Sequence, residues 1–276
     1  MLLGVQRETG TCWSLILLIS SIFPLMGRYL QAPVVVCGVY WWASAFFPQD
    51  VAYAQGECST EVKLLVSPAQ TQKVLTVLHA GKKVRGHIYL FDTEDLDLLS
   101  RGVTIRLRTA AKNDLTVKLR SAEPDNTKPP AGAQASKCEI DMIGNMALTS
   151  YSLRKAWRAG SVPETGDELR SALSADQVKL FRSAVTAIDW DRLKPQADIR
   201  ATLWDAHRDT SIEKISIELW EWTGGQILEL SARTSRQNGA LALRELHAIA
   251  ARSGLTVMDN QEAKTTLVLH ALKAAP

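Results

Sequence analysis

Apolar and polar side chains alternate with a period of two in several separate segments of this chain. Side chains two apart along a β-strand share one face, so this alternation predicts strands with one buried and one polar face. The predicted strands span residues 60–65, 87–91, 103–108, 115–120, 138–143, 199–204, 215–222 and 227–233. The connections 109–114 and 223–226 are too short for the crossovers that parallel strands need, which predicts antiparallel hairpins.

Helical spacing is confined to three segments, residues 68–80, 169–187 and 240–253. The last is the clearest, because Leu243, Leu246 and Ile249 form an apolar stripe and Gly254 follows directly. Residues 121–136 are polar and rich in Pro and Ala, which predicts a loop within the domain because strands flank both ends. We therefore expect an α+β, mainly β domain.

The first 54 residues differ from the rest of the chain. They contain two apolar runs, 11–25 and 32–47, and the small-residue sequence Ala-Tyr-Ala at 52–54, which is typical of a signal-peptide cleavage site. Met26 precedes the second run and makes a better start than Met1, since it gives a leader of ordinary length.

We predict that residues 1–54 form an export leader and that residues 55–276 form the mature domain. The alternative is an uncleaved N-terminal membrane anchor. Both apolar runs are shorter than the ~20 residues that a membrane-spanning helix needs, which favours cleavage. The mature protein is then expected in the periplasm or outside the cell, without stable membrane association after cleavage.

Net charge bears on the expected binding partners, and cysteine content bears on a possible disulfide. The net charge is +3 and the isoelectric point about 8.6, below what a concentrated nucleic-acid-binding surface usually gives, so we expect no nucleic-acid partner. Of four cysteines, Cys58 and Cys138 lie after the predicted leader. In an oxidising compartment they can form a disulfide, and the alternative of two buried thiols stays open. The oligomeric state is not predicted.

The polar faces of the predicted strands carry full charges that are sorted by sign. Arg106 and Arg108 share one face of a strand, and Lys118 and Arg120 share one face of the next. Like charges that face each other across a hairpin destabilise it, and a bound polyanion would offset their repulsion.

Carboxylates occupy the polar faces of other strands. Glu139 and Asp141 lie two residues apart, and Glu218 and Glu229 lie on later strands. Hard cations such as Mg²⁺ prefer carboxylate oxygens and often share their coordination with substrate phosphates. The alternative is an amphipathic sheet whose polar face is simply hydrated.

The order and spacing of these motifs resemble the CYTH superfamily, the triphosphate tunnel metalloenzymes. Glu61-Val62-Lys63 is similar to the end of the family's Glu-x-Glu-x-Lys signature, and residues 87–108 resemble its second and third strands, which end in Arg-x-Arg. Later matches resemble its Thr-x-Lys, Glu-x-Glu, Glu-x-Ser and terminal Ser-Lys motifs, at residues 115–120, 138–143, 227–231 and 263–264. The resemblance covers residues 59–272, nearly all of the predicted mature chain.

The resemblance implies an eight-stranded antiparallel β-barrel that forms a tunnel, with flanking helices and inward-facing charges. It implies metal-dependent hydrolysis of a triphosphate or short polyphosphate, such as inorganic or thiamine triphosphate, with Mg²⁺ or Mn²⁺ as cofactor. The implied phosphate-binding residues are Lys63, Arg106, Arg108, Lys118, Arg120, Arg200 and Lys264. The implied metal ligands are Glu61, Glu139, Asp141, Glu218 and Glu229. Glu61 and Lys63 are implied to be the catalytic pair.

Three positions depart from the family pattern. Ser59 stands where the signature has its first Glu, Ala263 stands where the last motif has Ser, and Asp141 is one methylene shorter than Glu. A non-catalytic, exported protein that binds polyphosphate or an organophosphate is therefore the second hypothesis. An ordinary β-sandwich with a hydrated polar face is the third.

Overall fold

The computed structural model describes residues 58–110, 113–121, 137–158, 160–207, 212 and 214–275. The predicted leader 1–54, its start at Met26 and all but the first residue of the predicted loop 121–136 lie outside this part of the chain. In the described part, no helix has both the length and the apolar character needed to span a membrane.

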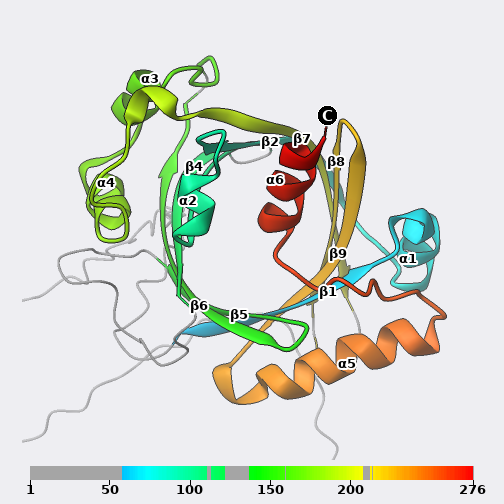
Figure 1. The fold of residues 1–276 in the computed structure, drawn as a ribbon. Coiled ribbons are helices and arrows are strands. Elements are labelled where there is room, and N and C mark those ends of the chain that lie inside the picture. Colours follow the sequence, from blue (N-terminus) through cyan, green and yellow to red (C-terminus); the bar gives the residue numbers. More distant parts are fainter. Residues whose placement is uncertain are drawn as a thin grey trace, which may run out of the picture. The chain divides into compact units, whose positions relative to one another are not determined.

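Nine strands of the described chain close into a barrel (Figure 1). They are β1 (Ser59–Val66), β2 (Lys83–Asp92), β3 (Val103–Thr109), β4 (Asp114–Ser121), β5 (Lys137–Ile143), β6 (Met146–Ala156), β7 (Lys194–His207), β8 (Lys214–Trp222) and β9 (Gly225–Thr234). The order around the barrel is β1-β5-β6-β4-β3-β2-β7-β8-β9, and β9 pairs with β1. Every predicted strand is present, so the expected mainly β barrel with flanking helices is confirmed.

β6 is the strand that the alternation did not predict. Ser150 and Ser152 occupy one face of β6, while Thr149 and Tyr151 occupy the other, so both faces contain polar side chains. Ser150 lies opposite Arg120 of β4 and also opposite Glu139 of β5, which places it beside charged groups. The inward side chains of β6 lie beside charged groups and therefore need not be apolar. For this reason apolar and polar residues do not alternate along β6.

One ladder departs from the expected antiparallel pairing. β1 and β5 run parallel, with Ser59 opposite Glu139 and Glu61 opposite Asp141. The other ladders between described strands are antiparallel. The parallel pair brings together two strands that are far apart in sequence, and no turn joins them directly.

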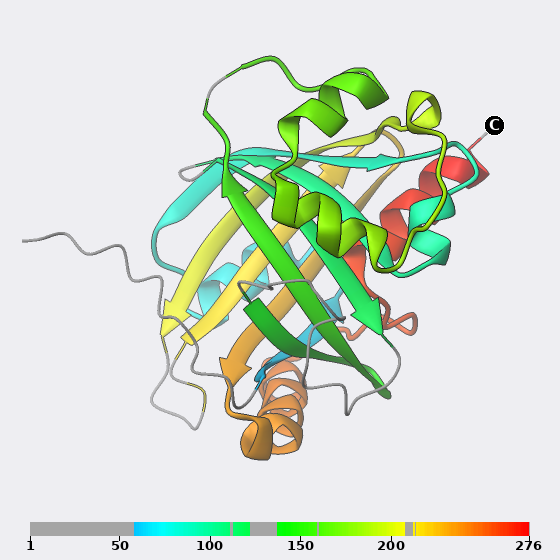
Figure 2. The ribbon, with the colours of Figure 1, turned by 90° about the vertical axis from the view of Figure 1, so that its left-hand side faces the viewer.

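Two groups of helices cover the outside of the barrel and confirm the predicted helical segments. α1 (Thr71–Val77) follows a short 3₁₀ turn and packs with α5 (Gly239–Arg252) on β1, β8 and β9. α3 (Gly166–Ala172) and α4 (Ala175–Arg182) pack on β3, β4 and β6 (Figure 2). Thr165 and Ser174 begin α3 and α4 with capping boxes, which satisfy free backbone N–H groups.

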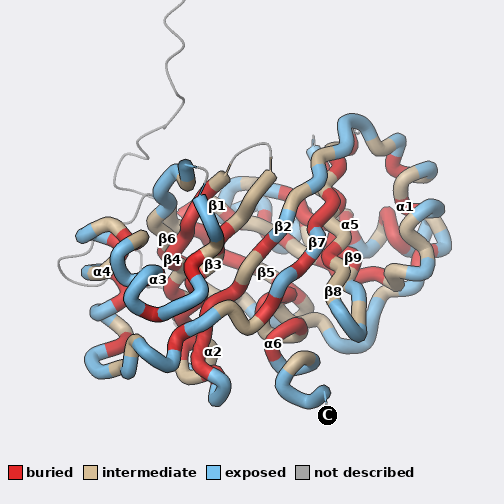
Figure 3. Tube along the Cα trace, turned by 90° about the horizontal axis from the view of Figure 1, so that it is seen from above, coloured by how far each residue is buried: buried red, intermediate tan, exposed pale blue. Residues whose placement is uncertain are grey.

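The last helix enters the barrel. α6 (Lys264–Ala274) packs Val268 and Leu269 against inward-facing Ile88, Ile199 and Trp220 of β2, β7 and β8. Its first turns are buried and its C-terminal end is exposed (Figure 3). One side of the barrel interior is therefore filled by apolar contacts, and the charged side chains share the other side.

Asp92 fixes the turn between β2 and the short helix α2 (Asp97–Ser100). Its carboxylate accepts hydrogen bonds from the backbone N–H groups of Thr93, Leu98 and Leu99, at 2.8, 2.8 and 3.0 Å. Leu96, just before α2, has a left-handed backbone with a φ of 63°, so the turn depends on this anchor.

Replacement of Asp92 by alanine is expected to lower the free energy of unfolding by about 2–4 kcal/mol, because it leaves three buried donors unsatisfied. Asp92→Asn keeps an acceptor oxygen and should lose less. Urea unfolding of both variants tests this. Equal losses in the two variants would show that the accepted hydrogen bonds are not what stabilises the turn.

Candidate functional site

The register of the ladders turns one set of charged side chains toward the inside of the barrel. On β3 and β4, Ile105 and Val117 lie opposite each other and pack outward against α4. Their neighbours Arg106 and Lys118 therefore face inward. The same alternation turns Glu61 of β1 inward, because its neighbour Val62 packs in the outer core.

Three carboxylates meet where the parallel strands pair. Glu61, Glu139 and Asp141 each have a carboxylate oxygen within 4.8 Å of the others. Glu139 and Asp141 are buried and Glu61 is largely buried. Oxygen ligands at this spacing can hold a hard divalent cation, so the acidic cluster (Glu61, Glu139 and Asp141) is the candidate metal site.

Within the acidic cluster, the negative charge of Asp141 is balanced by the largest number of lysine and arginine partners. Its oxygens lie 2.8 Å from Lys63 Nζ, 2.6 Å from Lys118 Nζ and 3.6 Å from Arg120 Nε. Burial alone would raise the pKa of Asp141, but these three cations hold it well below its ordinary range. Asp141 is therefore ionised at any ordinary pH.

Glu61 is also held in its ionised form. Lys63 Nζ lies 3.1 Å and Arg233 Nη2 lies 3.4 Å from its carboxylate oxygens. Burial would raise the pKa of Glu61, but Lys63 and Arg233 lower it to about 2. For Lys63 the balance is reversed: burial opposes its charge, while Asp141 and Glu61 raise its pKa above the ordinary value.

Glu218 and Glu229 form a separate group from the acidic cluster. They lie opposite each other on β8 and β9, and Lys264 at the start of α6 pairs with both. Lys264 Nζ is 2.9 Å from Glu229 and 4.6 Å from the centre of the Trp220 ring. Burial raises the pKa of Glu229. The predicted metal ligands are thus divided between two groups of residues.

Arg106 differs from the other inward-facing basic residues. It forms no ion pair with any described residue, and its buried Nε donates no hydrogen bond. Burial and the nearby Arg108 lower its pKa. Arg108, in contrast, donates two hydrogen bonds to Asp114, at 2.6 and 3.1 Å. An unpartnered guanidinium inside a charged barrel is suited to an anionic ligand.

Arg200 does not join this group, which corrects its prediction as a phosphate-binding residue. It lies opposite His87 and Glu221, on strand positions that face away from the interior, and its side chain is 71% exposed. It lines a hollow of about 620 Å³ on the outer wall with Lys83 and Trp204. The inward positions of β7 that pack against α6 hold small or apolar residues, so the position to which the resemblance gave a phosphate-binding role lies on the outer face.

Several charged partners were not among the predicted site residues. Lys137 and Arg233 pair with Glu139, and Asp114 pairs with Arg108. Arg233 lies at the end of a predicted strand, in phase with Glu229, so alternation contained the signal for it. Asp114 and Lys137 lie one residue outside the predicted strands, where strand boundaries are least certain from sequence.

The structure also shows where Ser59 and Ala263, two of the departures from the family pattern, are located. Ser59 lies opposite Glu139 at the edge of the acidic cluster, and its buried Oγ has no hydrogen-bond partner among the described residues. Ala263 immediately precedes α6 and offers no side-chain cap to it.

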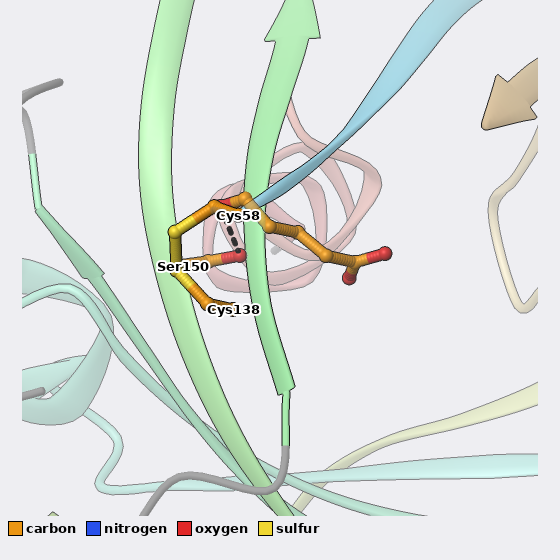
Figure 4. Close-up of a disulfide and its surroundings, with 4 residues drawn as sticks. Cys58, Cys138 and Ser150 are labelled. Carbon is orange, nitrogen blue, oxygen red and sulfur yellow. Dashed lines mark hydrogen bonds between the residues drawn. A yellow bond between two sulfur atoms is a disulfide. The ribbon is translucent and has the colours of Figure 1, made fainter. Parts of the chain in front are cut away.

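A disulfide bond joins Cys58 to Cys138 (Figure 4), and Cys138 is the residue before Glu139 of the acidic cluster. The Cα atoms are 4.8 Å apart, which is within the ordinary range for disulfides. Ser150 of β6 lies next to the bond and donates a hydrogen bond of 3.3 Å to the backbone carbonyl of Glu139. Of the two arrangements that the sequence left open, the structure contains the disulfide.

No protein-family model matches the chain, and no curated protein matches it. Solved structures do match its fold. A protein from Hippeastrum, described as a candidate adenylyl cyclase with a dominant triphosphatase activity, is 16% identical with a TM-score of 0.52, over 78% of this chain and 97% of that chain.

Two further structures are described as adenylate cyclase candidates. One, from Bacillus halodurans, is 18% identical over 76% of this chain and 97% of its own, with a TM-score of 0.43. The other, from Vibrio parahaemolyticus, is 14% identical over 78% of this chain and 99% of its own, with a TM-score of 0.42. The described part of this chain has the barrel fold of the Hippeastrum protein.

Proposed function

We propose that this protein is an exported, divergent member of the CYTH superfamily that hydrolyses a triphosphate or short polyphosphate with a divalent metal ion. The observation that carries the proposal is the acidic cluster, which lies inside a closed barrel beside inward-facing lysines and arginines. The fold shared with the Hippeastrum protein, whose described activity is a triphosphatase activity, supports the same class of small-molecule phosphate substrate.

The inward-facing charges of the described chain are predominantly basic. The basic members are Lys63, Arg106, Arg108, Lys118, Arg120, Lys137, Arg154, Lys214, Arg233 and Lys264. The acidic members are Glu61, Asp114, Glu139, Asp141, Asp205, Glu218 and Glu229. A triphosphate would neutralise the excess positive charge, which a neutral ligand would leave uncompensated.

The proposed roles follow from the geometry of the side chains. Arg106 would bind phosphate oxygens directly, because its buried Nε has no acceptor to release among the described residues. Lys118 and Arg120 would exchange part of their contact with Asp141 for contact with phosphate. Phosphoryl transfer depends mainly on positioning and electrostatic stabilisation, which a rigid barrel with fixed charges provides.

Glu61, Glu139 and Asp141 would hold Mg²⁺ or Mn²⁺, since carboxylate oxygens are the ligands these ions prefer. A bound divalent ion would supply neutralisation of phosphate charge and activation of water. The very low pKa of Glu61 suits a ligand that must stay ionised rather than accept a proton. Lys63 would hold Glu61 and Asp141 in place and contact phosphate.

A second candidate function is non-catalytic binding of a polyphosphate. Two observations favour it: Ser59 replaces a carboxylate at the edge of the acidic cluster, and each member of the cluster already has a lysine or arginine partner within 4 Å. A metal ion must displace such partners. The Ser59→Glu variant tests this candidate, because an added carboxylate should raise metal affinity and metal-dependent activity together.

The proposed location outside the cytoplasm has independent support from the disulfide. Cys58 and Cys138 are joined, and structural disulfides persist mainly in oxidising compartments. Free thiols at both positions in protein isolated from its natural location would argue against export.

The lowered pKa of Lys118 predicts that tripolyphosphate affinity depends on pH. Burial lowers this pKa to about 8, because the opposing effect of Asp141 does not overcome burial together with Arg120 and Lys63. A polyanion binds the charged ammonium better, so metal-free tripolyphosphate affinity should fall as the pH rises through about 8. Calorimetric titration across this range measures it. Lys118→Arg stays charged, so an identical pH profile in this variant would exclude Lys118 as the source.

The enzymatic test is phosphate release by the full chain from tripolyphosphate, ATP or thiamine triphosphate, with Mg²⁺ or Mn²⁺. We expect metal-dependent release from at least one of these substrates, abolished in the Lys63→Ala, Glu229→Ala double variant. Tight tripolyphosphate binding without release would favour the binding protein. Neither binding nor release would contradict both candidates.

A further inference from the structure

The acidic cluster depends on the register of a strand pair that no turn controls. β5 is joined to β6 by a two-residue turn at Gly144 and Asn145, which fixes their register. β5 and β1 are connected only through distant parts of the chain, and Cys58 and Cys138 are separated by 80 positions in the sequence. A parallel ladder is slightly weaker per residue than an antiparallel one.

A shift of one residue in this ladder would disperse the acidic cluster. Glu61 lies opposite Asp141, and Ser59 lies opposite Glu139. Because alternate residues face opposite sides, a slip of β5 by one position would turn Glu139 and Asp141 toward the outer core. Lysine and arginine partners offset the mutual repulsion of the carboxylates, and the native register keeps the three carboxylates together.

The disulfide lies where it can enforce that register. Cys58 immediately precedes β1 and Cys138 is the second residue of β5, so the bond ties the two strands at the start of their ladder. Glu139 directly follows Cys138 in sequence, and Glu61 is three residues after Cys58. Cys58 is buried, while Cys138 is partly exposed.

The inward-facing arginines of β3 and β4 are held in position by contacts that do not involve the disulfide. The β3–β4 ladder fixes Arg106 and Arg120, and Asp114 on the same hairpin holds Arg108. Neither strand pairs with β1 or β5. Loss of the disulfide should therefore disturb the acidic cluster much more than the basic hairpin.

We propose that the Cys58–Cys138 disulfide is a positioning element that keeps the acidic cluster competent to bind a divalent cation, so that metal affinity depends on its redox state. This inference rests on the proposed function of the acidic cluster as a metal site. A dithiol would break the sulfur–sulfur bond and leave two cysteine thiols, while the dithiol itself is oxidised to a cyclic disulfide.

The test compares two affinities in the oxidised full chain and in the Cys58→Ser, Cys138→Ser double variant. Free Mn²⁺ is measured by electron paramagnetic resonance, and metal-free binding of tripolyphosphate is measured by calorimetry. The matched control is Cys12→Ser, Cys37→Ser, which removes the other two cysteines. We expect Mn²⁺ affinity to fall by about 10- to 100-fold in the test variant alone. Tripolyphosphate affinity should change much less in that variant.

Several results would overturn the inference. Unchanged Mn²⁺ affinity in a folded test variant would show that the disulfide does not position the cluster. Equal losses of both affinities would show a general structural role. Absence of Mn²⁺ binding by the oxidised wild type would contradict the proposed metal site itself. If the test variant does not fold, the same two titrations on wild type reduced with dithiothreitol carry the same expectations.

Discussion

Replacement of Arg106 by alanine is expected to weaken tripolyphosphate binding by about 10- to 100-fold, since each charge-assisted hydrogen bond contributes about 1.5–3 kcal/mol. The same substitution should raise the free energy of unfolding by about 1 kcal/mol, because it removes a buried guanidinium whose Nε has no acceptor. A residue that raises ligand affinity but lowers the free energy of unfolding is typical of a binding site. Calorimetry and urea unfolding measure the two effects.

The matched control is Arg200→Ala, which removes an arginine from the outer wall. It should leave tripolyphosphate affinity unchanged. An equal loss of affinity in the two variants would indicate a response to net charge rather than a site inside the barrel. A loss of stability in Arg106→Ala would contradict the view that this side chain has no protein partner.

Replacement of Asp141 by asparagine should have the largest effect on stability. It removes the charge that compensates Lys63, Lys118 and Arg120, and breaking buried ion pairs from one side costs about 3–5 kcal/mol. Metal-dependent activity should also be lost, because the acidic cluster loses a carboxylate. Thermal unfolding and phosphate-release assays measure the two effects.

Tripolyphosphate distinguishes this prediction from an ordinary core defect. Bound polyanion would supply the missing negative charge, so saturating tripolyphosphate should stabilise Asp141→Asn more than it stabilises wild type. Asp198→Asn is the matched control, since this aspartate pairs with His87 on the outer surface. Equal stabilisation of Asp141→Asn and wild type would mean that the three cations do not contact the ligand.

The predicted strands and outer helices followed from patterns that depend on local burial. Leu243, Leu246 and Ile249 repeat with a helical period because α5 buries only one face on the barrel wall. The alternation of Arg106 and Arg108 with Ile105 and Leu107 is equally clear, because the outer side of β3 is apolar throughout.

The features missed by sequence reasoning arise where tertiary contacts replace those patterns. α6 lies inside the barrel, so its apolar residues contact the inner faces of β2 and β7 and not an outer core. The inward residues of β7 that contact α6 are small or apolar, and Arg200 lies on the opposite, outward face. The parallel β1–β5 ladder could not be found from local signals, since it depends on closure of the whole barrel.

The division of the predicted metal ligands has the same origin. Sequence placed Glu218 and Glu229 with the other carboxylates, because all five occupy polar positions of strands. Their separation depends on Lys264, which enters with α6 and pairs with both. The described carboxylates that lie together away from Lys264 are therefore Glu61, Glu139 and Asp141.

The central claim is that a metal ion and a triphosphate bind together inside the barrel. Anomalous scattering from crystals of the full chain grown with Mn²⁺ and tripolyphosphate tests it most directly. The account predicts a manganese peak among Glu61, Glu139 and Asp141, with phosphate oxygens contacting Arg106. Manganese and phosphate bound elsewhere, with the cluster still paired to its lysines and arginines, would contradict it.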